Sequence, residues 1–223
     1  MSSWLLSFSS VAEVLEGLVA LAVYYQAFKF YRLSGEKALL HVSASFLALG
    51  VGLLAHGLSL GAVLLVLAGP VRALIKLALL ISEVMALALF GCEAFAYGYL
   101  AYFYAKPSQE EAAEGLLFPL VLRETPEKPP RPEALIRFIR YHPLLECVVL
   151  ALLVYLTYKT ISNFLSSRDA NPFLIGFAFL FLTAAHACFM LSYFLATFYF
   201  TAHVLQLLAF VCVFIVLLRV VSA

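Results

Sequence analysis

The sequence predicts an all-α integral membrane protein with six transmembrane helices, arranged as a 3+3 internal repeat of inverted topology. Its 223 residues are 65% hydrophobic and only 12% charged, with a mean hydropathy of +1.02. Soluble domains are about half apolar and about a quarter charged. The apolar residues form long segments, and ionisable residues recur inside these segments at matching spacings. This composition excludes a soluble enzyme, and the net charge of +1 gives no indication of nucleic-acid binding.

The first half contains three segments that exceed the roughly 20 apolar residues needed to cross a bilayer. The first covers residues 8–32 and ends in a basic aromatic stretch. The second covers 37–68 and ends before Gly69 and Pro70, because proline lacks an N–H and breaks a helix. The third covers 71–105 and ends in a cluster of tyrosines, which suits a membrane interface.

Residues 106–134 have a different composition from the rest of the chain. They hold six of the nine prolines and six of the thirteen acidic residues. A transmembrane helix cannot accommodate that composition, so we expect an extramembrane connector. Residues 133–142 then form an amphipathic lead-in to the second half.

The second half contains three further apolar segments, at 143–165, 172–196 and 199–221. The chain therefore divides into a first three-helix unit (1–105), the connector (106–134) and a second three-helix unit (135–223).

The distribution of Lys and Arg predicts how the chain is oriented in the cell membrane. Loops after the first, third and fifth segments carry nine basic residues, and the opposite side carries five. Both termini are therefore expected outside the cell and the connector in the cytoplasm.

Matching the chain to itself indicates the internal repeat. A shift of 130 residues superposes Glu16 on Glu146 and His56 on His186, and a shift of 120 superposes Cys92 on Cys212. Leucine-rich segments match by chance, but polar identities carry more weight. Because each unit has an odd number of crossings, the two units are expected to run in opposite directions.

Six ionisable residues are expected at one depth, because counting 1.5 Å per residue from each turn brings them level. These residues are Glu16, His56, Glu83, Glu146, His186 and His203. Ionisable groups inside a bilayer normally face the bundle interior. Three carboxylates and three imidazoles suit a transition metal such as Zn, Fe or Mn, or a proton relay.

Three neighbouring polar residues are not predicted to be ligands themselves. Glu13 and Gln206, each one turn from a predicted ligand, are expected in the surrounding shell. Glu93 has no counterpart in the second unit and is interpreted as a hydrogen-bonding group between helices.

Four functions fit this pattern. The first is a small transporter or channel for a divalent metal cation, protons or both. The second is a b-type haem protein in electron transfer, with His56 and His186 as axial ligands. The third, a metal-dependent enzyme with Glu16 or Glu83 as base, lacks a supporting motif such as HExxH. The fourth is a sensor or assembly subunit without a ligand, and for each function a homo-oligomer is possible.

Overall fold

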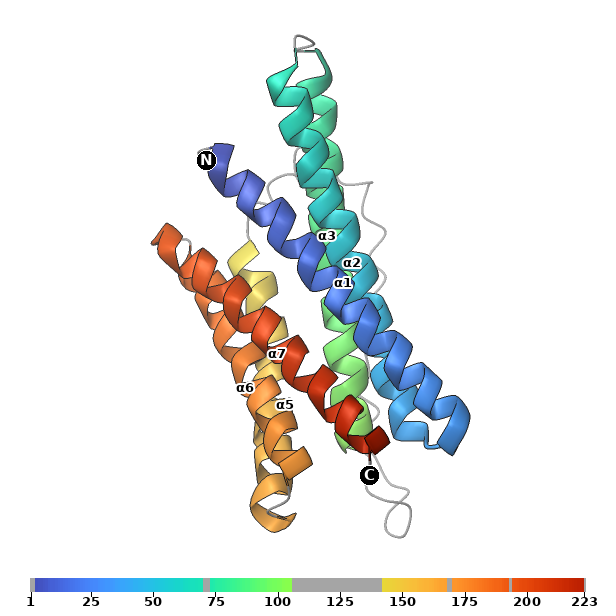
Figure 1. Cartoon of the computed structure of the whole chain (residues 1–223). Coiled ribbons are helices and arrows are strands. Elements are labelled where there is room, and N and C mark those ends of the chain that lie inside the picture. The colour runs from blue at the N-terminus through green and yellow to red at the C-terminus, as the bar shows by residue number, and fades with distance from the viewer. Residues whose placement is uncertain (1–2, 70–72, 106–141, 168–169, 193, 223) are drawn as a thin grey trace, which may run out of the picture.

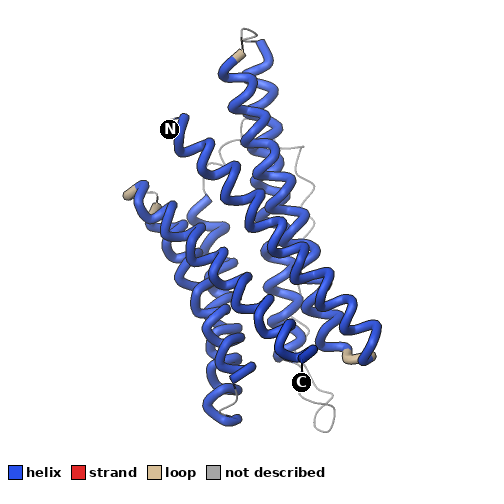
Figure 2. The backbone as a smooth tube through the Cα atoms, viewed as in Figure 1, coloured by secondary structure: helices blue, strands red, loops and turns tan. Residues whose placement is uncertain are grey.

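The computed structural model describes residues 3–69, 73–105, 142–167, 170–192 and 194–222, which are helical apart from short turns (Figure 2). The helices are α1 (Ser3–Ser34), α2 (Lys37–Ala68), α3 (Ala73–Ala105), α5 (His142–Ser167), α6 (Ala170–Leu191) and α7 (Ala196–Ser222).

Six helices in the described part of the chain are long and apolar enough to span a membrane. The predicted multi-pass helical membrane protein is therefore confirmed. The predicted connector at 106–134 lies outside the described residues, and the division into units at its borders stays a prediction.

A glycine ends the first helix. Gly35 has a φ of 72°, and its N–H donates to the carbonyl of Tyr31 at 2.8 Å. This left-handed residue closes the helix and lets the chain reverse into α2, because glycine adopts positive φ without steric cost.

Glycines also let α1 and α2 approach closely. A Cβ added to Gly57 would lie 3.0 Å from Cβ of Glu13 and 3.1 Å from the carbonyl oxygen of Ser10. One added to Gly50 would lie 3.2 Å from the carbonyl of Gly17. Small residues at this interface therefore allow the backbones of the two helices to lie close together.

The helix contacts close into a ring. Each helix packs against its neighbour in the chain, α3 contacts α5, and α7 contacts α1. Figure 1 shows the two groups of three side by side, α1–α3 in blue to green and α5–α7 in yellow to red.

The two groups run in the same direction, which corrects the expectation of inverted halves. Ser9 of α1 bonds Tyr199 of α7, and Glu16 of α1 bonds His203 of α7. The residue numbers therefore increase in the same direction along these two helices. Along α3 and α5, Glu93 lies near Glu146, and Gly98 faces Leu152. Helices α1, α3, α5 and α7 are therefore parallel, and α2 and α6 run against them (Figure 1).

The start of α1 and the end of α7 consequently lie at opposite ends of the bundle (Figure 1). The expectation that both termini share one side is not reproduced. It assumed that helices joined by the connector run antiparallel, whereas α3 and α5 run parallel.

Candidate metal centre

A cavity of about 280 Å³ lies inside the helix ring. All six described helices contribute residues to its lining. Its polar lining residues are Glu13, Glu16, His56, Glu93, Glu146, Ser192, Tyr199, His203 and Gln206. Leucines, phenylalanines, Ala86 and Met190 form the rest.

Three Glu–His hydrogen bonds hold the polar groups in place. His186 Nδ1 lies 2.8 Å from Glu146 Oε2, which joins α6 to α5. His203 Nδ1 lies 2.9 Å from Glu16 Oε1, which joins α7 to α1. The third joins α2 to α1, where His56 Nδ1 lies 2.6 Å from Glu13 Oε2.

Of the two Glu–His pairs spaced by 40 residues in the sequence, only one forms a hydrogen bond within the pair. Glu146 and His186 bond each other. In the first unit, however, Glu16 bonds His203 and not His56, and His56 bonds Glu13. The first unit therefore divides its polar contacts between its own α2 and α7 of the second unit.

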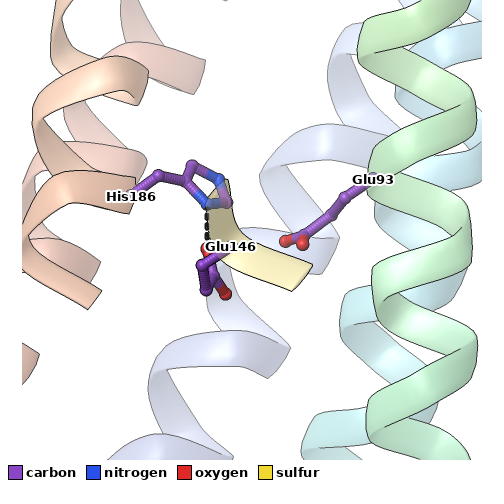
Figure 3. Close-up of side chains that lie close together, drawn as sticks. All are labelled: Glu93, Glu146 and His186. Carbon is purple, nitrogen blue, oxygen red and sulfur yellow. Dashed lines mark hydrogen bonds and ion pairs between the residues drawn. The ribbon is translucent and has the colours of Figure 1, made fainter. Parts of the chain in front are cut away.

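Glu93, Glu146 and His186 form the tightest group. Their potential ligand atoms all lie within 4.8 Å of one another, and they come from α3, α5 and α6. Figure 3 shows the Glu93 carboxylate extending from α3 toward the bonded pair. We call these three side chains the metal cluster.

The structure places Glu93 in the position on α3 that we expected for Glu83. Ala86, Phe90 and Glu93 line the cavity, and the half-buried Glu83 lies one turn beyond Ala86 on the same face. Counting residues from the turn at Gly69 and Pro70 had placed His56 and Glu83 at the same depth in the bundle. The contact of Gly52 with Cys92 and the bond of Ser45 to Ala96 instead place His56 nearer Ala86.

Glu93 was not predicted as a ligand because only residues with a polar counterpart in the other unit were selected. The position matched to it by the shift of 120 is Val213, which carries no polar group. A more general signal was available, since any acid within an apolar segment indicates a functional site.

Several buried polar atoms around the cavity have no hydrogen-bond partner among the described residues. They are Glu16 Oε2, Tyr97 Oη, His186 Nε2, His203 Nε2 and both amide atoms of Gln206. An unpaired buried polar atom costs about 1–3 kcal/mol. A polar or charged species bound here would satisfy these atoms.

The charge of the lining favours a cation. Four carboxylates line the cavity, and no Lys or Arg among the described residues does. Glu13, Glu16 and Glu93 are each less than a tenth exposed. Carboxylates buried at this density require protons or a bound cation.

Glu146 and His186 lie toward one end of the second helix group as it is described. Glu146 is four residues from the start of α5, and His186 is five residues from the end of α6. At 1.5 Å per residue, these groups lie about 6–8 Å along the helices from the described start of α5 and the described end of α6.

No protein-family model, curated protein or solved structure matches this chain. The molecule is a multi-pass helical membrane protein with a buried Glu/His group whose atoms are placed to hold a metal ion.

Proposed function

We propose that this protein binds a divalent transition metal cation inside the membrane and transports it. The convergence of Glu93, Glu146 and His186 from three helices is the observation that carries this proposal.

The ligand set suits such an ion in charge and in number. Two carboxylates balance a divalent charge, and a neutral imidazole adds a nitrogen ligand, as Zn, Fe and Mn accept. Ligand atoms around tetrahedral zinc lie about 3.3 Å apart. The present separations, up to 4.8 Å, require only a small side-chain movement of Glu93 to close.

Three features support movement of the ion and not only its storage. Three protein ligands leave a coordination position open, as in zinc sites that exchange their fourth ligand. The cavity, at about 280 Å³, exceeds the space that one water needs, about 10–15 Å³. The cluster also joins helices of both groups, so a shift of one group against the other would change the ligand set.

We also propose that the two units are copies of one repeat and that the chain has a defined orientation. The ring of contacts supports the repeat. When α1, α2 and α3 are matched to α5, α6 and α7, the contact between α3 and α5 corresponds to the contact between α7 and α1. Because the groups run in the same direction, the units would be related by an axis along the membrane normal.

The orientation follows from the described basic residues. One end of the bundle carries Lys29, Arg32, Lys37, Lys159 and Arg219, and the other carries Lys76. The basic end is therefore cytoplasmic, and α1 begins outside.

Metal binding by purified full-length protein tests the proposal. Zn²⁺ and Mn²⁺ titrated calorimetrically should bind the wild type, and Glu93→Gln and Glu146→Gln should each weaken binding at least about tenfold. Glu83→Gln is the matched control. It removes an acid from the same face of α3, outside the lining, and should bind like the wild type.

Liposomes enclosing a metal-sensitive dye then separate transport from binding. Uptake that is lost in Glu93→Gln and kept in Glu83→Gln supports transport. Binding without uptake would favour a sensor, and a Soret band in the purified protein would favour haem. Equal metal binding by the wild type and all variants would contradict a metal site at Glu93, Glu146 and His186.

A further inference from the structure

A second chain of hydrogen bonds runs through the other side of the cavity. Tyr199 of α7 bonds Ser9 of α1, Ser9 Oγ donates to Glu13 Oε1 at 3.0 Å, and Glu13 Oε2 lies 2.6 Å from His56 Nδ1. We call these four residues the relay. None of them belongs to the metal cluster.

The chain is continuous and shielded. Ser9 is 1% exposed and Glu13 is 4% exposed. The single Ser9 proton points to Glu13, so Tyr199 donates to Ser9. Each residue of the relay is hydrogen-bonded directly to the next, so no bridging water is needed between them.

The two ends of the relay lie at different places. His56 lines the cavity from the middle of α2. Tyr199 also lines the cavity, but it lies three residues from the start of α7, next to the turn that follows α6. A proton that crosses the relay therefore moves along the cavity wall toward the end of the bundle where α7 begins.

We propose that the relay from His56 through Glu13 and Ser9 to Tyr199 conducts protons along the cavity wall, between His56 and the end of the bundle where α7 begins. This function goes beyond metal binding and does not depend on it.

The transfer balances in protons. A proton from cavity water binds His56 Nε2, and the proton on Nδ1 moves to Glu13 Oε2. The Glu13 carboxyl group then rotates, and the Ser9 and Tyr199 hydroxyl groups turn so that Ser9 donates to Tyr199 and Tyr199 donates to water. The Glu13 proton passes to Ser9, the Ser9 proton passes to Tyr199, and the Tyr199 proton leaves to water. One proton enters and one leaves, and the starting state returns when the hydroxyl and carboxyl groups rotate back and the His56 proton returns from Nε2 to Nδ1.

Other charged groups face the relay. Glu16 and His203, which bond each other on α1 and α7, and Glu93 on α3 all interact electrostatically with Glu13. The Glu16–His203 pair offers no hydrogen bond that bypasses Ser9 among the described residues.

Proton flux in liposomes tests the relay. Full-length protein is reconstituted with an enclosed pH-sensitive dye, in chelator, with the membrane potential clamped by valinomycin and K⁺. The wild type should dissipate an imposed pH gradient. Ser9→Ala and Tyr199→Phe should each slow this flux by about a hundredfold, because each removes a proton-transfer group.

Matched variants control for folding and site. Ser43→Ala removes a buried hydroxyl that bonds only Leu40 of its own helix, and Tyr24→Phe removes a tyrosine hydroxyl of α1 outside the lining. Both should conduct like the wild type. Unchanged thermal unfolding would show that the relay variants are folded.

The outcomes keep the two proposals apart. Glu93→Gln should lose metal binding and keep proton flux, whereas Ser9→Ala should do the reverse. A wild type that leaves the gradient intact, or folded Ser9→Ala and Tyr199→Phe variants that conduct normally, would overturn the relay.

Discussion

At the scale of single residues, the three cavity histidines share one arrangement. Each directs Nδ1 to a glutamate carboxylate, which holds the ring and places a proton on Nδ1. The lone pair on Nε2 is then available to another species. In His186 and His203 this atom is buried without a partner among the described residues, so these rings are prepared to bind.

Gln206 offers a test of whether the cavity holds polar species in the resting protein. It is 1% exposed, and neither amide atom has a partner among the described residues. Gln206→Leu keeps the approximate volume and should stabilise the metal-free protein by about 1 kcal/mol, because an unpaired buried amide is removed. The midpoint of thermal unfolding measures this.

The same substitution at Gln26 controls for a general gain in hydrophobicity, since Gln26 is half-buried on α1 and lies outside the lining. A lower midpoint for Gln206→Leu alone would mean that the amide is hydrogen-bonded, by water in the cavity.

At the scale of elements, the closeness of α1 and α2 decides whether Glu13 reaches His56. Gly57 lies next to His56 in sequence and against Glu13 across the helix interface, and its carbonyl accepts a bond from Ser10 at 2.8 Å. The same close approach therefore packs the helices and sets the Glu13–His56 distance.

Gly57→Ala should destabilise the protein by about 1–3 kcal/mol, because the added Cβ would lie 3.0 Å from Cβ of Glu13 and force the helices apart. Gly91→Ala is the matched control. No atom lies within 4 Å of a Cβ added there, and alanine should stabilise the helix by about 1 kcal/mol. Thermal unfolding distinguishes them, and equal effects would contradict the close packing.

At the scale of the whole molecule, the parallel course of the two helix groups determines which chain ends share a side. Arg219 at the end of α7 lies at the same end of the bundle as Lys37 at the start of α2, and Lys76 lies at the other end. The sequence-based expectation grouped Arg219 with Lys76.

Labelling of introduced cysteines in cells tests this topology. In a background with Cys92, Cys147, Cys188 and Cys212 replaced by serine, Lys37→Cys and Arg219→Cys should react only from the cytoplasm. Lys76→Cys should react with a membrane-impermeant reagent from outside. Labelling of Arg219→Cys from outside would restore the inverted arrangement.

The extent of each helix was accessible from sequence, because the cost of placing polar groups in lipid acts locally on each stretch of chain. The predicted segment 37–68 coincides with α2. Most of the glutamates and histidines that line the cavity were also accessible, since ionisable groups avoid lipid wherever the neighbouring helices lie. Glu93, Ser192 and Tyr199 line it as well and were not predicted as site residues.

The sequence by itself determined the six apolar helices and most of the glutamates and histidines that line the cavity, because both depend on the hydrophobicity of individual segments. Only the tertiary structure decided which glutamate meets which histidine and which way each group runs. Glu16 and His203 are separated by 187 positions, and their bond depends on the rotation and direction of two helices that hydropathy does not specify. Contacts between segments far apart in the chain set both.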